Sequence, residues 1–168
     1  MAGDQRPLAT LTSPRQDFVV GLGANLGEPE AQLRRAVEKV RALAHTELLA
    51  CSPLYRSAAL GPPQPDYLNG AVRIRSGMAP LALLDALLEI EEGEGRIRTL
   101  RWGPRTLDLD ILWAEQMCSV PRLHIPHLRL RERWWALRPL LDVAPELSGE
   151  YGPTLSGLGP VQIPVLML

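Results

Sequence analysis

The spacing of apolar residues along the chain predicts three helices. Apolar positions recur three and four residues apart over residues 30–43, with charged residues between them, and Pro29 stands where a helix would begin. Pro80 begins a second such segment, which covers residues 80–94 and is followed by glycine. A shorter helix is expected over residues 131–141. Each long helix should therefore bury one apolar side against another layer of the fold.

Four other segments have the patterns of β-strands. Residues 18–23 form a short apolar run that ends in glycine, and residues 47–55 look like a second strand. Polar and apolar residues alternate over residues 67–75 and from Thr106 onward. The order is then strand, helix, strand, strand, helix, strand. This order predicts an α+β, ferredoxin-like βαββαβ fold with an antiparallel sheet, helices on one face and functional loops over the other.

Length and composition indicate one globular domain. The chain has 168 residues, of which 46% are hydrophobic and 22% charged, and no apolar run approaches the roughly twenty residues of a membrane helix. Residues 1–16 contain two prolines and no periodicity, so we expect a flexible leader followed by a single domain over residues 17–168. The N-terminus does not resemble a secretory signal, which favours the cytoplasm.

Charge and cysteine content exclude several classes of protein. A net charge of -1 provides no general attraction for nucleic acid, and seventeen of the eighteen cations are arginine, a bias that genomic composition can also produce. Cys51 and Cys118 are too few for a disulfide scaffold and lie in no zinc-binding cluster. We therefore expect a monomer with no nucleic-acid or membrane partner.

The stretch from residue 101 to residue 113 concentrates the candidate chemistry. Residues two apart on a strand point to one face, so Asp108 and Asp110 should project together. Two adjacent carboxylates repel each other unless a hard cation such as Mg²⁺ lies between them, and substrate phosphates usually complete its coordination. Arg101 and Arg105 are placed to hold such phosphates. The opposite, core face would receive three apolar residues, Leu107, Leu109 and Ile111.

The same pattern has a simpler explanation. An Asp-x-Asp pair on a strand is often only a solvated face, and nearby arginines are often only its salt-bridge partners. The spacing alone leaves both explanations open.

Five motifs, taken together and in order, resemble the 6-hydroxymethyl-7,8-dihydropterin pyrophosphokinase family. They are Gly23-Ala24-Asn25-Leu26-Gly27; Tyr55-Arg56-Ser57 with Leu60-Gly61-Pro62; Pro65-Asp66-Tyr67-Leu68-Asn69; Arg101 to Asp110; and Ile125-Pro126-His127 with Pro139-Leu140 and Ala144-Pro145-Glu146-Leu147. The resemblance covers about residues 17–148. It implies a ferredoxin-like fold and the transfer of pyrophosphate from ATP to the hydroxymethyl group of the dihydropterin, with release of AMP, in folate biosynthesis.

The resemblance also implies roles for individual residues. Four match catalytic positions: Arg96 and Arg105 handle phosphates, and Asp108 and Asp110 bind two Mg²⁺ ions. Six would contact ATP, namely Glu91, Arg98, Arg101, Trp102, Arg122 and His127. Six would bind the pterin, namely Ser57, Ala58, Leu60, Tyr67, Asn69 and Trp135. Tyr67 and Trp135 would sandwich the flat ring, and the amide of Asn69 would meet its polar edge.

Other interpretations remain open at this point. Each arginine can be a surface ion pair, and Glu91, with Glu89, Glu92 and Glu94 around it, can belong to a solvated acidic helix end. A different metal-dependent phosphoryl or nucleotidyl transferase would use the same carboxylates but release ADP or pyrophosphate. A ferredoxin-like RNA-binding module is a third class, although the expected sheet lacks a basic aromatic motif.

Overall fold

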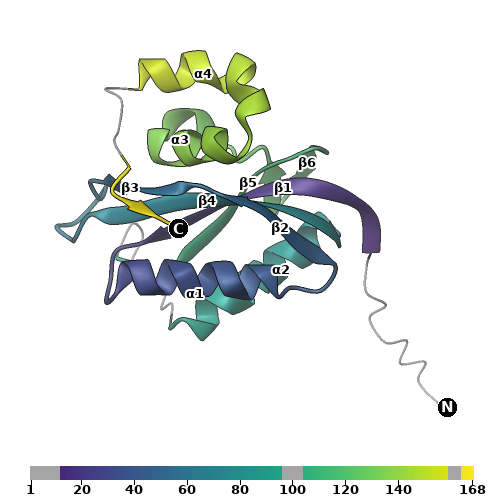
Figure 1. Ribbon diagram of the computed structural model, residues 1–168, viewed down its shortest axis with the longest axis horizontal. Helices are drawn as coiled ribbons and strands as arrows, with labels where there is room; N and C mark the ends of the chain where they lie inside the picture. The colour runs from purple at the N-terminus through teal and green to yellow at the C-terminus, as the bar shows by residue number, and fades with distance from the viewer. Residues whose placement is uncertain (1–11, 96–103, 159–163) are drawn as a thin grey trace.

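The computed structural model describes residues 12–95, 104–158 and 164–168, and its centre is a six-stranded antiparallel sheet (Figure 1). β1 (Thr12–Ala24) lies between β5 (Asp108–Ala114) and β4 (Tyr67–Met78). β4 also pairs with β2 (Thr46–Cys51) and β3 (Pro53–Ser57), and β3 pairs with β8 (Leu166–Met167). The order β5, β1, β4 and then β2 with β3 confirms the predicted ferredoxin-like arrangement.

Helices cover both faces of this sheet. Figure 1 shows α1 (Pro29–Arg41) and α2 (Pro80–Gly93) below it, as predicted, and α3 (Trp134–Val143) and α4 (Ser148–Gly157) above it. The prediction of helices on one face alone was therefore incomplete. Three shorter features complete the described chain: the ribbon of β6 (Cys118–Val120) and β7 (Leu123–Ile125), and 3-10 turns at Leu130–Glu132 and Pro145–Leu147.

Each face of the sheet has its own apolar core. The first core lies between the sheet and helices α1 and α2. It contains Leu33, Ala36, Val37 and Val40 of α1, whose spacing is that of one helical face. It also contains Leu107, Leu109 and Ile111, which confirms their predicted direction. The second core lies under α3 and α4 and is built from Val19, Ala71, Leu112, Leu130, Leu137, Leu140, Val143, Ala144 and Tyr151.

A β-bulge in β5 supplies part of the second core. Val19 lies opposite Trp113 and Val20 opposite Ile111, so Leu112 is an extra residue in the pairing with β1. Leu112 and Trp113 consequently both pack in the second core, and Ala114 returns to the first. Strict alternation along this segment would have placed Trp113 on the wrong face.

Two boundaries differ from the predicted ones. The predicted strand over residues 47–55 is divided between β2 and β3 at Ser52, whose hydroxyl accepts a 2.8 Å hydrogen bond from Ala71 N, and the following Pro53 has no N–H to donate. β1 begins at Thr12, within the predicted leader, and pairs with the far end of β4. Residues 1–11 of that leader lie outside the described part of the chain.

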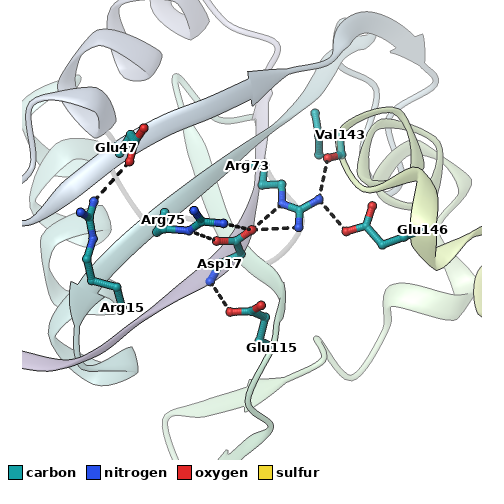
Figure 2. Close-up of polar contacts among 8 residues, drawn as sticks. All are labelled: Arg15, Asp17, Glu47, Arg73, Arg75, Glu115, Val143 and Glu146. Atoms are coloured by element: carbon teal, nitrogen blue, oxygen red, sulfur yellow. Dashed lines mark hydrogen bonds and ion pairs between the residues drawn. The ribbon is translucent and has the colours of Figure 1, made fainter.

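The buried residue Asp17 links β1 to β4 and, through Arg73, to α3 (Figure 2). Only 1% of Asp17 is exposed, and its carboxylate accepts hydrogen bonds from Arg75 Nε at 2.7 Å and Arg73 Nε at 2.9 Å. Arg73 also donates to Glu146 Oε1 at 2.5 Å and to Val143 O, at the C-terminal end of α3. The backbone N of Asp17 donates to Glu115 Oε2 just after β5.

These contacts determine the protonation state of Asp17. Burial raises the pKa of its carboxyl, but the hydrogen bonds from Arg75 and Arg73 outweigh burial and hold the pKa below the ordinary 3.8. A carboxyl whose pKa is depressed by folding stabilises the fold when ionised. This contribution is present at neutral pH and is lost as the pH falls below about 4.

Replacing Asp17 by asparagine should lower the free energy of unfolding by about 3 kcal/mol, because Arg73 would lose its buried counter-charge. Urea denaturation at pH 7 measures the change, and part of the wild-type loss of stability below pH 4 should disappear. Arg15→Gln is the control, since it removes only the exposed ion pair with Glu47 and should cost less than about 1 kcal/mol. Equal losses in the two variants would contradict the anchoring role.

Candidate active site

The largest group of predicted site residues meets in one cavity on the face of the sheet that carries α3. The cavity holds about 170 Å³ and lies where β1 and β3 end, β4 and β5 begin, and α3 begins. Ten of the predicted residues line it: Ser57, Ala58, Leu60, Tyr67, Asn69, Arg105, Asp108, Asp110, His127 and Trp135. They come from segments up to 78 residues apart in the sequence, from Ser57 to Trp135, so only the fold brings them together.

Strand register places the polar side chains across the cavity floor. Gly23 lies opposite Asp108 on one side and opposite Asn69 on the other. Neighbouring strands are about 4.8 Å apart, so Asp108 and Asn69 are separated by roughly 10 Å, with a glycine that has no side chain between them. Gly21 lies opposite Asp110, but the side chain of Leu112 occupies the space above it, 2.9 Å from where a Cβ would stand. The open part of the floor is therefore at Gly23, between Asp108 of β5 and the amide of β4.

The two aspartates differ in their surroundings. Asp108 accepts a hydrogen bond from Arg105 Nη1, which neutralises it locally. Burial raises the pKa of Asp110, the negative charges of Asp108 and Glu91 raise it further, and Arg133 and Arg105 lower it; the net result is a pKa of about 7. The positive charge around Asp110 is therefore not enough to keep its carboxyl fully ionised at neutral pH. A divalent cation between the two aspartates would supply that charge, so the oxygen donors of this pair fit a hard metal ion.

Arg105 is held at the cavity by Asn25. The backbone N of Arg105 donates to Asn25 Oδ1 at 2.9 Å, and the backbone N of Asn25 donates to Arg105 O at 3.1 Å. The side-chain amide of Asn25 also donates to Gln64 Oε1 and Pro65 O, both at the end of the loop that follows β3. Asn25 belongs to the first of the five motifs, and no role was predicted for it. In the structure it connects Arg105 to the end of the loop that follows β3.

The amide of Asn69 is already oriented. Its Nδ2 donates to Ser57 Oγ at 2.8 Å and to Tyr55 O at 3.2 Å, and the residue is 6% exposed. This assignment of the amide directs its Oδ1 toward the floor at Gly23, where an added Cβ would lie 3.6 Å from it. The sheet thus presents a carbonyl oxygen of Asn69 beside the glycine floor.

The ring of His127 has a defined hydrogen-bonding pattern. Its Nδ1 accepts from the backbone N of Arg129 at 3.1 Å, so a neutral ring carries its proton on Nε2. Burial lowers the pKa of His127, and the charge of Arg133 lowers it further. His127 is therefore a neutral N–H donor at neutral pH.

Trp135 lines the cavity at the N-terminal end of α3, whereas Trp134 does not line it. The two rings meet edge to face, with centroids 6.0 Å apart and planes at 87°. Of the two neighbouring tryptophans, only Trp135 therefore faces the cavity.

Two predicted residues lie outside the cavity. Glu91 is 1% exposed, so the alternative interpretation, that it belongs to a solvated acidic helix end, is wrong. Its Oε1 accepts a 2.7 Å hydrogen bond from Leu109 N in β5. Arg122 forms an exposed ion pair with Asp85 of α2. Four further predicted residues, Arg96, Arg98, Arg101 and Trp102, lie outside the described part of the chain.

Two arginines that were not predicted as site residues also lie at the cavity. Arg129 and Arg133 line it, and both follow His127 at intervals of two and six residues. Arg129 forms an ion pair with Glu132 at 3.0 Å. The density of arginines just after His127 was the available signal, but the same density occurs at surface positions such as Arg131, which pairs with Glu150.

Comparisons with known proteins show the family to which the chain is similar. Residues 19–145 match the sequence profile of the family described as 7,8-dihydro-6-hydroxymethylpterin-pyrophosphokinase (HPPK). The chain is 47% identical over 152 residues to the 2-amino-4-hydroxy-6-hydroxymethyldihydropteridine pyrophosphokinase of Pseudomonas aeruginosa, with 88% of this chain and 94% of that protein covered. It is 43% identical over 143 residues to the protein of the same name from Synechocystis sp., with 83% and 73% covered.

Solved structures with a similar fold are larger proteins. A Plasmodium falciparum HPPK-DHPS bound to pterin and p-hydroxybenzoate superposes with a TM-score of 0.61 at 13% identity, covering 80% of this chain and 40% of that one. Another HPPK-DHPS, in complex with substrates, has a TM-score of 0.59 at 13% identity and covers 86% and 43%. This chain spans less than half the length of those proteins, and the likeness concerns the fold.

The raised pKa of Asp110 predicts that its ionisation destabilises the metal-free protein. Because the folded pKa of about 7 exceeds the ordinary 3.8, the penalty is complete above pH 7 and fades as the pH falls toward 4. Asp110→Asn should therefore raise the free energy of unfolding at pH 8 by on the order of 1 kcal/mol or more, and by less at pH 5. Thermal unfolding in EDTA measures this gain.

The control for Asp110→Asn is Asp85→Asn, which removes an exposed carboxylate from α2 and should change stability little at either pH. If Asp110→Asn were no more stable than the wild type at pH 8, the assigned pKa of Asp110 would be wrong.

Proposed function

This chain belongs to the 7,8-dihydro-6-hydroxymethylpterin-pyrophosphokinase family, and we propose that the cavity described above is where it performs the reaction of that family. The enzyme transfers pyrophosphate from ATP to the hydroxymethyl group of 6-hydroxymethyl-7,8-dihydropterin in folate biosynthesis. Two phosphates leave ATP as one unit, so the second product is AMP.

One observation supports the cavity most directly. Its floor carries the carboxylates of β5 at one side and the amide of Asn69 at the other, with Gly23 of β1 between Asp108 and Asn69. Phosphates with a metal ion require the first kind of group, and the polar edge of a pterin requires the second. A reaction that joins a phosphate chain to a pterin needs both within one site.

We assign the metal-binding role to Asp108 and Asp110, which would hold two Mg²⁺ ions. Mg²⁺ held there would neutralise the charge of the phosphate oxygens, so that the hydroxymethyl oxygen could approach the phosphorus. Arg105, half-buried beside Asp108, adds a fixed positive charge where charge spreads over the transferred phosphates. His127, with its N–H on Nε2, is a donor to ATP, and we propose that Arg96, Arg98, Arg101, Trp102 and Arg122 also act on the ATP side.

Glu91 supports this site in a different way from the predicted contact with ATP. Its buried carboxylate receives the N–H of Leu109, the residue between the two aspartates, on the side of β5 away from β1. We propose that this bond holds β5 in place behind the metal-binding pair. The negative charge of Glu91 also contributes to the raised pKa of Asp110, which favours binding of a cation.

On the pterin side, we propose that Asn69 meets the polar edge of the ring and that Tyr67 and Trp135 enclose its faces. Ser57, Ala58 and Leu60 form the adjoining wall, and Ser57 holds the amide of Asn69 in position. Aromatic side chains on both faces of a flat heterocycle provide dispersion and exclude water. We also propose that the enzyme acts as a monomer in the cytoplasm. Among the residues described here, no helix is long and apolar enough to cross a membrane.

Incubation of the protein with ATP, Mg²⁺ and 6-hydroxymethyl-7,8-dihydropterin should form AMP and the pterin pyrophosphate in equal amounts, measured by chromatography. Asp110→Asn should reduce turnover by about two orders of magnitude or more, since the metal would lose one of its two carboxylates. Glu38→Gln, which removes an exposed carboxylate from α1, should keep wild-type turnover. Formation of ADP in place of AMP would instead indicate a single-phosphate transferase.

The two adjacent tryptophans allow a matched test of the acceptor pocket. Trp135→Ala should raise the dissociation constant of the pterin by about tenfold or more and leave that of ATP within about twofold, because only the ring facing the cavity is removed. Trp134→Ala deletes an equal ring outside the cavity and should have a smaller effect. Calorimetric titration measures both constants, and equal pterin affinities in the two variants would refute the assigned role of Trp135.

A further inference from the structure

A polar cluster under α3 connects the two sides of the acceptor pocket. Tyr55 in β3 is 1% exposed, and its hydroxyl donates to Asp142 Oδ2 at 2.6 Å. Arg138 donates from Nε to the same hydroxyl at 3.3 Å and from Nη2 to Asp142 Oδ1 at 2.9 Å. The three side chains form a closed set of hydrogen bonds between the sheet and the helix, which we call the Tyr55 cluster.

The backbone of Tyr55 contacts the pterin side of the sheet. Tyr55 lies opposite Asn69 in the pairing of β3 with β4, and its carbonyl oxygen accepts a hydrogen bond from Asn69 Nδ2 at 3.2 Å. One residue therefore touches Asn69 through its main chain and α3 through its side chain. A change in how α3 sits on Tyr55 would change the distance from α3 to Asn69.

Trp135 lies on the same helix as two members of the Tyr55 cluster. Arg138 and Asp142 follow Trp135 by three and seven residues, so all three side chains lie along one side of α3. The helix has only ten residues, and Pro139 inside it has no N–H to donate to the carbonyl of Trp135. The N-terminal turn that carries Trp135 is therefore weakly held by the hydrogen bonds of the helix itself, and its position depends on contacts with the sheet.

We propose that Tyr55, Asp142 and Arg138 are positioning residues that set the separation between Trp135 and Asn69, and so the width of the slot that admits the pterin ring. This inference rests on the proposed pterin contacts of Trp135 and Asn69. The Tyr55 cluster does not touch the reacting atoms. It acts through the placement of α3 and should influence binding of the acceptor much more than the chemical step.

Burial keeps the cluster in one hydrogen-bonding state at neutral pH. Desolvation raises the pKa of the Tyr55 phenol, and its hydrogen bond to Asp142 raises it further. The hydroxyl therefore stays protonated and donates to Asp142. Because Arg138 contacts both partners, removal of the hydroxyl alone leaves Asp142 with a counter-charge.

Tyr55→Phe is the appropriate test, since it removes the hydroxyl and keeps the buried ring. The dissociation constant of 6-hydroxymethyl-7,8-dihydropterin, measured by calorimetry with a non-hydrolysable ATP analogue present, should rise roughly tenfold, the size expected for one hydrogen bond to a charged group. The dissociation constant of the ATP analogue alone and kcat at saturating pterin should each change by less than about twofold. A fall in kcat without a change in pterin affinity would overturn the proposal.

Tyr151→Phe is the matched control, because Tyr151 is also a buried tyrosine, 1% exposed, but packs in the second core from α4. It should leave pterin affinity unchanged. An equal loss in Tyr151→Phe would show that the effect in Tyr55→Phe is only a general loosening of the core.

A double-mutant cycle separates this inference from the proposed roles on which it rests. If Tyr55 acts through Trp135, Tyr55→Phe should weaken pterin binding much less in a Trp135→Ala background than in the wild type. Additive losses would overturn the proposal. An unaltered pterin affinity in Trp135→Ala alone would refute the assigned pocket instead, and absence of AMP formation by the wild type would refute the reaction.

Discussion

The hydrogen-bond register of β1 with β4 and β5 is the constraint on which the site depends. This register sets Gly23 opposite both Asp108 and Asn69, and no side-chain contact could produce the same alignment alone. A slip of one residue would turn the aspartates into the apolar core and bring Leu109 to the cavity floor. The apolar residues that alternate with the aspartates oppose such a slip, so packing of the first core also fixes the polar groups on the other face.

The two faces of the sheet have different tasks. α1 and α2 lie over the face where the first core is formed, whereas α3 and α4 lie over the other. The site lies where α3 begins, so that the helix is both a cover for the second core and a wall of the cavity. Contacts in the C-terminal part of α3 then matter to the wall formed by its first turn: Arg73 bonds Val143, and Tyr55 bonds Asp142.

Local patterns were sufficient for the parts of the structure that repeat regularly. Alternation along β5 gave the direction of Asp108 and Asp110, and helical spacing gave α1 and α2 nearly to their ends. The bulge at Leu112 was not predictable, because the extra residue is defined only by pairing with β1. The same holds for Tyr55 and Asp142, which are 87 residues apart, and for the burial of Glu91, whose partner is a backbone N–H in another element.

The anchor at Asp17 has a consequence for how this sequence can change over time. Loss of Asp17 leaves Arg73 without a buried counter-charge, and loss of an arginine leaves the carboxylate less neutralised, so each single replacement is penalised. A set of apolar residues of similar size would nevertheless support the same fold about equally well. A sequence that changes from the charged set to the apolar set one residue at a time would pass through less stable proteins. The three charges are therefore entrenched by one another, and related chains should keep them or lack them as a group.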